Sequence, residues 1–182
     1  MKVVILYADG FEDVEAIATR DVLVRAGIDV LDAKINLNNQ IVVSSHKVSL
    51  TGLFDLKNIK VEDYEALILP GGGRGVQNLL KSSEVDRLVQ EFYKAGKWVC
   101  AICAAPMVLA KNGLLHDRRY TCYPGCNDGL DGIYTGEEVV LTDKIVTARS
   151  MLYSVPFGLK IVELILSKDV ADRVYRQIAG LN

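Results

Sequence analysis

The chain has 182 residues, of which 50% are hydrophobic, and its 21 basic and 23 acidic residues give a formal net charge of −2. This length and composition indicate one domain over residues 1–182 with a sizeable core, and they exclude a disordered chain. No basic stripe suggests nucleic-acid binding, and no apolar run is long enough to span a membrane. The N-terminal apolar run is too short for a signal peptide, so we expect a cytoplasmic protein with reduced cysteines.

Strands and helices are expected to alternate along the chain. The expected strands are residues 3–7, 28–33, 66–69 and 97–102, and the expected helices are residues 12–26, 83–95, 104–112, 154–167 and 168–180. Within residues 36–55, short β-prone pieces at 41–43 and 47–50 suggest an antiparallel excursion. Residues 137–141 and 144–148 suggest a hairpin through Thr142 and Asp143. The alternation predicts an α/β fold with a mostly parallel sheet and helices on both faces.

The junction at Cys103 is the most informative segment. The strand at 97–102 runs directly into the helical segment at 104–112, so Cys103 should occupy a sharp turn at the carboxyl edge of the sheet. Ala101 and Ala105 supply the small residues that a nucleophile elbow requires two positions before and after the nucleophile. A helix N-terminus favours the thiolate, so we predict a reactive Cys103 with a pKa below the usual value of about 8.5. This prediction requires a neutral Glu15, because an ionised Glu15 would oppose the shift.

The four cysteines could also have structural, zinc-binding or redox roles. A free cysteine is more often a buried hydrophobic residue, and Cys100 fits that description. The pairs Cys100 with Cys103 and Cys122 with Cys126 resemble two halves of a zinc site, but Cys100 lies inside a strand rather than on a short turn. A redox Cys-x-x-Cys pair would straddle a helix start instead of preceding one. We therefore expect no metal and no cofactor.

Two other loops, residues 8–15 and 70–75, should meet the elbow at Cys103, because ligands bind beyond the carboxyl ends of parallel strands. Glu15 stands in a largely uncharged helical row, so burial should keep it protonated and able to donate to a thiolate; a purely structural role stays open. The glycine loop at 71–75 has Val76 in place of the third fingerprint glycine and has no Walker lysine. It could form an oxyanion site from backbone N–H groups, or only a tight turn.

A hydrolytic cysteine needs a base, which is usually histidine. The two histidines, His46 and His116, lie outside the three loops, so amide hydrolysis is disfavoured. We expect Tyr123, at the end of a later strand, to approach the site instead.

Three motifs occur in order at residues 10–15, 69–79 and 101–106. Together they make almost the whole chain resemble the ThiJ/PfpI superfamily, specifically its DJ-one and YajL-like branch. The resemblance implies a flavodoxin-like α/β sandwich of the class I glutamine amidotransferase-like type, usually a homodimer. It also implies that Cys103 is the nucleophile and oxidation-sensitive thiol, that protonated Glu15 lies against it, and that the amides of Gly72 and Ala104 form the anion site.

The sequence departs from the family pattern at several positions. Protease-like members carry histidine directly after the cysteine, where this chain has Ala104. Tyr123 stands where the human-type branch has histidine and YajL-like members have an aromatic residue. Residues 150–153 replace a Gly-Pro-Gly-Thr-like turn after Arg149, in a segment similar in place to one that lines the pocket and the dimer contact. Tyr123 and Arg149 are therefore candidate pocket residues.

The resemblance implies a stress-protective, cofactor-independent protein of glyoxalase or deglycase type that acts on aldehydes or dicarbonyls. The alternative is a redox sensor or chaperone without turnover, and an intracellular cysteine peptidase is the least supported reading. The glyoxalase and the redox-sensor interpretations both need the Cys103 thiol and the Glu15 carboxyl. For the homodimer, we expect the helix at 12–26 to expose Val22 and Ala26 beside Arg25, and His46 to lie where relatives have a basic residue that reaches the other subunit.

Overall fold

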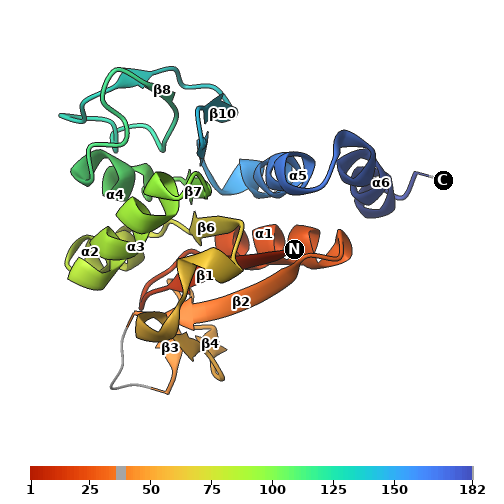
Figure 1. Ribbon diagram of the computed structural model, residues 1–182, viewed down its shortest axis with the longest axis horizontal. Helices are drawn as coiled ribbons and strands as arrows, with labels where there is room; N and C mark the ends of the chain where they lie inside the picture. The colour runs from red at the N-terminus through yellow and green to blue at the C-terminus, as the bar shows by residue number, and fades with distance from the viewer. Residues whose placement is uncertain (36–39, 182) are drawn as a thin grey trace.

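The computed structural model describes residues 1–35 and 40–181 and shows an α/β sandwich (Figure 1). Within these residues a seven-stranded sheet has the order β10-β11-β7-β6-β1-β2-β5. The strands are β1 (Lys2–Tyr7), β2 (Asp29–Lys34), β5 (Phe54–Asp55), β6 (Ala66–Leu69), β7 (Trp98–Ile102), β10 (Val139–Thr142) and β11 (Ile145–Ala148). All neighbouring pairs are parallel except the β10–β11 hairpin. The predicted fold class is confirmed.

Helices cover both faces of this sheet (Figure 1). One face carries α1 (Asp13–Arg25), α5 (Ser154–Ile165) and α6 (Lys168–Ala179), and the other carries α2 (Gly73–Leu80), α3 (Ser83–Lys94) and α4 (Pro106–Lys111). The sequence of the central strand β1 is continuously apolar because the strand is covered on both faces. Val4 and Leu6 pack into one core and Val3, Ile5 and Tyr7 into the other, so every second residue is buried on each face.

Short elements complete the chain. They are β3 (Val42–Val43), β4 (Ser49–Leu50), β8 (Arg119–Tyr120), β9 (Ile133–Tyr134) and the 3₁₀ helices η1 (Leu56–Asn58), η2 (Val61–Asp63) and η3 (Met151–Tyr153). The β3–β4 pair is antiparallel, as expected for the excursion, although residues 36–39 of that predicted segment lie outside the described residues. Tyr123 follows β8 in a turn and does not end a strand. None of the helices in the described ranges could cross a membrane.

Two helix starts differ from the sequence prediction by two or more residues. The helix expected at 104–112 begins at Pro106, and Ala104 and Ala105 belong to the turn before it. The segment expected as a glycine loop up to residue 75 already forms the first turn of α2 from Gly73 onwards. Gly75 is needed there because a Cβ at this position would lie 2.8 Å from the backbone nitrogen of Phe11.

The prediction that Val22 and Ala26 are exposed on α1 for a dimer contact is wrong. Val22 is only 1% exposed, and Ala26 is also buried. Val22 packs against Gly158 of α5 so closely that a Cβ at Gly158 would lie 2.9 Å from the Val22 Cβ. Val22 therefore belongs to the core, and the exposed apolar residues of α1 are Val14, Ile17 and Val24.

Candidate active site

Cys103 occupies the strained turn that the sequence predicts. It follows β7 directly and has a φ of 64°, in the left-handed region that costs a non-glycine residue about 1–3 kcal/mol. The surrounding structure holds this turn, because the Cys103 N–H donates to the Ala148 carbonyl at 2.9 Å and the Tyr123 N–H donates to the Cys103 carbonyl at 2.9 Å. Ala101 and Ala105 are both completely buried, which agrees with the need for small neighbours.

Glu15 is held in the first turn of α1 and is 1% exposed. Its N–H donates to the capping carboxylate of Glu12 at 2.7 Å, and its own Oε2 accepts the Gly71 N–H at 2.9 Å. Its second oxygen, Oε1, is fully buried as well. Both oxygens of the carboxyl group are therefore removed from water.

Gly71 lies between the acid and the thiol. A Cβ at this position would lie 2.4 Å from the Glu15 Oε2 and 2.7 Å from the Cys103 Cβ. The next residue, Gly72, has a φ of 94°, and a Cβ there would lie 2.4 Å from the Gly10 carbonyl oxygen. Bare backbone at Gly71 lets the segment after β6 approach the elbow closely, and bare backbone at Gly72 lets it approach the loop before α1.

Two backbone amides point at the Cys103 sulfur. The N–H groups of Ala104 and Gly72 hydrogen-bond to it and act to lower its pKa. One amide comes from the turn after β7 and the other from the loop after β6, so two separate segments converge on one atom. Two fixed donors aimed at one point are the arrangement that stabilises a developing oxyanion.

The electrostatics of Glu15 agree with the sequence prediction. Burial raises the pKa of the Glu15 carboxyl from 4.5 to about 7, and the nearby charge of Glu12 also raises it. Hydrogen bonds from Cys103, Gly71 and the Met151 backbone act in the opposite direction. Desolvation is the largest of these effects, so a substantial fraction of Glu15 carries its proton near neutral pH.

The predicted low pKa of the Cys103 thiol is wrong. Burial raises this pKa above its ordinary value, the charge of the Glu15 carboxylate and its hydrogen bond raise it further, and the amides of Ala104 and Gly72 oppose the shift. The sequence could not show how much water the sulfur loses in the folded protein. Since an ionised Glu15 disfavours the thiolate, thiolate forms most readily when Glu15 holds the proton, and the two groups titrate as a coupled pair.

Tyr123 and Arg149 both lie beside the elbow, but they make different contacts there. Tyr123 contacts Cys103 through its backbone, while 51% of the residue is exposed. Arg149 follows Ala148, and its guanidinium donates to the Gly136 carbonyl at 2.9 Å and to the Tyr153 hydroxyl. Its side chain therefore braces η3 against the preceding loop.

Neither histidine hydrogen-bonds to Cys103 among the described residues. His46 pairs with Asp13 at 2.7 Å, and His116 pairs with Asp131; both histidines are exposed. The ligand-type atoms of Glu12, Asp13 and His46 lie within 4.8 Å of one another. The helix cap made by Glu12 and the Asp13–His46 pair account for this cluster as structural contacts.

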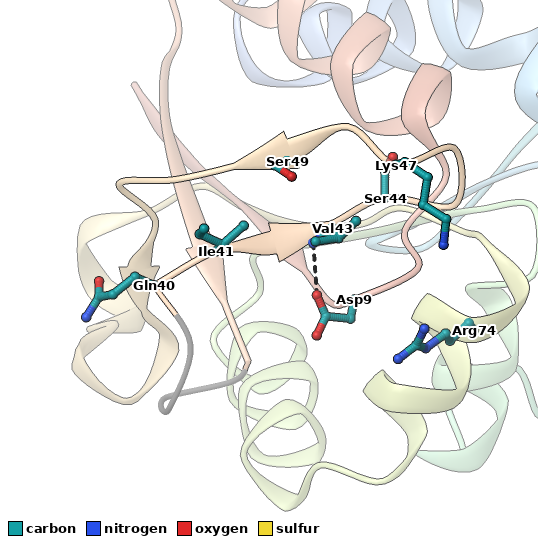
Figure 2. Close-up of a pocket in the computed structure, with 8 residues that line it drawn as sticks. All are labelled: Asp9, Gln40, Ile41, Val43, Ser44, Lys47, Ser49 and Arg74. Carbon is teal, nitrogen blue, oxygen red and sulfur yellow. Dashed lines mark hydrogen bonds between the residues drawn. The ribbon is translucent and has the colours of Figure 1, made fainter.

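A separate cavity of about 580 Å³ lies between the β3–β4 hairpin and α2 (Figure 2). Asp9, Lys47 and Arg74 line it, whereas Cys103 and Glu15 do not. The sequence analysis placed the glycine loop at 71–75 and the segment at 150–153 near the site. It did not predict that Gly71 and the Met151 backbone contact Glu15.

Comparison with known proteins decides the family. The model of the DJ-1/PfpI family matches residues 1–164. This chain belongs to the DJ-1/PfpI family. The glutathione-independent glyoxalase DJ-1 of Schizosaccharomyces pombe is 30% identical over 98% of both chains, and a deglycase of Pyrococcus abyssi is 31% identical over 82% of this chain and 90% of its own.

The fold comparison agrees with the family. A crystal structure of a mutant DJ-1 superfamily protein from Salmonella typhimurium superposes with a TM-score of 0.91 at 30% identity. The match covers 100% of this chain and 98% of that one. The DJ-1/PfpI fold therefore extends over the whole chain.

Replacing Gly71 with alanine tests the contact between the acid and the thiol. The new methyl group would overlap the Glu15 Oε2 and the Cys103 Cβ, so Gly71→Ala should lower the melting temperature and change the rate at which Cys103 reacts with a thiol probe. Gly73→Ala is the matched control, because a Cβ at Gly73 meets no atom within 4 Å. Equal behaviour of the two variants would contradict the proposed close contact.

Proposed function

We propose that this protein is a cofactor-independent glyoxalase that converts 2-oxoaldehydes to 2-hydroxy acids at Cys103. The observation that supports this most is the convergence on one sulfur of a buried acid with a pKa of about 7 and two backbone amides. The relatives in S. pombe and P. abyssi are named glyoxalase and deglycase, which agrees with a carbonyl substrate.

The geometry supports a stepwise mechanism. The Cys103 thiolate adds to the aldehyde carbon, and the amides of Gly72 and Ala104 stabilise the oxygen that gains charge, giving a hemithioacetal after protonation. Glu15 supplies the proton that forms the hemithioacetal and becomes a carboxylate. This carboxylate then removes the proton from the former aldehyde carbon and returns it to the neighbouring carbon, which leaves Glu15 ionised until it regains a proton from the Cys103 thiol when the thioester is hydrolysed. Water hydrolyses the resulting thioester, so the net reaction adds one water. A pKa near 7 suits an acid that must both accept and donate.

The alternative function is a redox sensor without turnover. Cys100 and Cys122 are completely buried, whereas Cys103 keeps some exposed surface and can meet an oxidant. A protonated Glu15 could donate a hydrogen bond to a sulfinate on Cys103. This alternative uses the same residues and requires no conversion of a carbonyl compound.

Lactate production from methylglyoxal separates these functions. Wild-type protein should produce lactate without added cofactor, and both Cys103→Ser and Glu15→Gln should lose activity by about 100-fold or more, as expected when a nucleophile or a proton-transfer group is removed.

Glu62→Gln serves as the matched control, because it makes the same chemical change at an exposed residue of η2 that does not belong to the site. It should keep most of the activity. Undiminished turnover by Cys103→Ser would rule out the mechanism, and a wild-type protein that makes no lactate would favour the redox alternative.

We also propose a homodimer, with a contact different from the one expected at Val22. Val14 and Ile17 on α1 and Met151 and Leu152 on η3 are exposed apolar residues, and Leu152 is 76% exposed. The Met151 backbone hydrogen-bonds to Glu15 in the first turn of α1, so the two groups adjoin each other beside the site. An apolar surface of this kind fits an isologous contact between two copies.

A charge at Ile17 tests the dimer. Ile17→Asp should sediment as a smaller species than the wild type, because a two-fold contact would receive the new charge twice. Leu141→Asp is the control, since Leu141 is also exposed but lies on the edge strand β10. A wild-type protein that sediments as a monomer at micromolar concentration would refute the proposal.

A further inference from the structure

The cavity between the β3–β4 hairpin and α2 has no role in the proposed turnover. Its volume of about 580 Å³ lies within the range of roughly 300–1,000 Å³ that is usual for small-molecule sites. Its lining comes from three segments: the loop after β1, the hairpin and the first turn of α2 (Figure 2). Cys103 and Glu15 do not line it, so a ligand bound here would be separate from the elbow.

The walls of this cavity are fixed by hydrogen bonds between the hairpin and the loop after β1. The Asp9 Oδ1 accepts the Val43 N–H at 2.9 Å, as drawn in Figure 2, and the Gly10 N–H donates to the Val43 carbonyl at 2.7 Å. The hydroxyl of the buried Ser44 accepts the Val48 N–H at 2.9 Å and closes the hairpin turn. The cavity is therefore formed before any ligand binds, which limits the ordering cost of binding.

Two cations line the cavity from different segments. Lys47 reaches into it from the hairpin and Arg74 from the first turn of α2, as Figure 2 shows. The stem of Arg74 lies against bare backbone, because a Cβ at Gly10 would lie 2.6 Å from the Arg74 Cβ. Within residues 1–35 and 40–181, neither cation forms an ion pair or a side-chain hydrogen bond. Two such positive charges around one cavity attract an anion.

Asp9 limits which anion fits. Its carboxylate lines the same cavity and repels a small anion that brings no hydrogen-bond donor. Since Oδ1 is held by the Val43 N–H, Oδ2 is the oxygen that can accept a hydroxyl group of a ligand. The Ser49 hydroxyl adds a further polar group, and Ile41 adds an apolar side chain that can contact carbon atoms. The lining therefore favours a ligand with an anionic group and several hydroxyl groups on a short carbon skeleton.

We propose that this cavity binds a small polyhydroxy phosphate monoester, with its phosphate between Lys47 and Arg74 and a hydroxyl group on Asp9. A phosphate monoester carries about −1.5 to −2 charges at pH 7, which matches the two cations, whereas a carboxylate carries a single charge. The planar guanidinium of Arg74 can donate two parallel hydrogen bonds to phosphate oxygens, and the Lys47 ammonium adds a point charge. The binding is non-covalent and requires neither Cys103 nor Glu15.

Titration with sorbitol 6-phosphate tests this proposal, because this polyol phosphate has no carbonyl group that could react with Cys103. Isothermal titration calorimetry of the full-length protein should show one site with a Kd below about 1 mM at low salt. The amide NMR signals of Val43, Lys47 and Arg74 should shift during the titration. Sorbitol lacks the charge and inorganic phosphate lacks the hydroxyl groups, so each should bind at least about 10-fold more weakly.

Substitution of the two cations separates this cavity from other basic surface. Lys47→Gln and Arg74→Gln should each weaken the binding of sorbitol 6-phosphate by about 10-fold or more, because each removes a charged donor. Lys81→Gln is the matched control and should bind like the wild type, since Lys81 is exposed at the end of α2 and does not line the cavity. Cys103→Ser should also bind with wild-type affinity, which makes the result independent of the proposed turnover.

Three results would overturn the proposal. The first is that sorbitol 6-phosphate does not bind at millimolar concentration, or that Lys81→Gln weakens its binding as much as the two cavity variants do. The second is that inorganic phosphate binds equally well, because the hydroxyl group assigned to Asp9 would then contribute nothing. The third is a set of NMR shifts confined to Gly72, Cys103 and Ala104, which would place the ligand at the elbow.

Discussion

The close approach of Gly71 to both Glu15 and Cys103 is the constraint on which the site depends. The Gly71 N–H holds the Glu15 carboxylate at 2.9 Å, and no side chain fits at this glycine without displacing the acid or the thiol. Cys103 completes the contact only because its left-handed turn is fastened on both sides, to Ala148 and to Tyr123. Four other segments of the chain thus meet at Cys103.

In this geometry, the reactivity of Cys103 depends on whether Glu15 carries a proton. An ionised Glu15 raises the pKa of the Cys103 thiol, whereas the hydrogen bond from that thiol lowers the pKa of Glu15, so the thiolate is best formed beside a neutral acid. The amides of Gly72 and Ala104 then stabilise the one charge that remains. The protonated Glu15 carboxyl can assist addition of Cys103 to a carbonyl compound, and it can also donate a hydrogen bond to an oxidised Cys103 sulfur. The glyoxalase and redox-sensor functions therefore need the same two residues.

Much of the fold could be predicted because β1, β6 and β7 are covered on both faces, which leaves continuous apolar runs in the sequence. Cys103 could be found because its elbow needs small neighbours at fixed positions. The burial of Val22 could not be predicted, since it depends on Gly158 in a distant helix. The raised pKa of the thiol was missed for the same reason: desolvation is set by tertiary packing that Cys103 and its immediate neighbours do not encode.

The most direct test of the central claim measures the protonation state of Glu15 as a function of pH. The infrared band of its protonated carboxyl group is obtained by subtracting the spectrum of the Glu15→Gln variant from that of the wild type. The folded protein should show this band below neutral pH and lose it with a midpoint of about 7, because burial disfavours the ionised form. A midpoint near the ordinary value of 4.5 would mean that Glu15 is a carboxylate throughout the physiological range. That result would contradict a neutral acid beside the Cys103 thiolate.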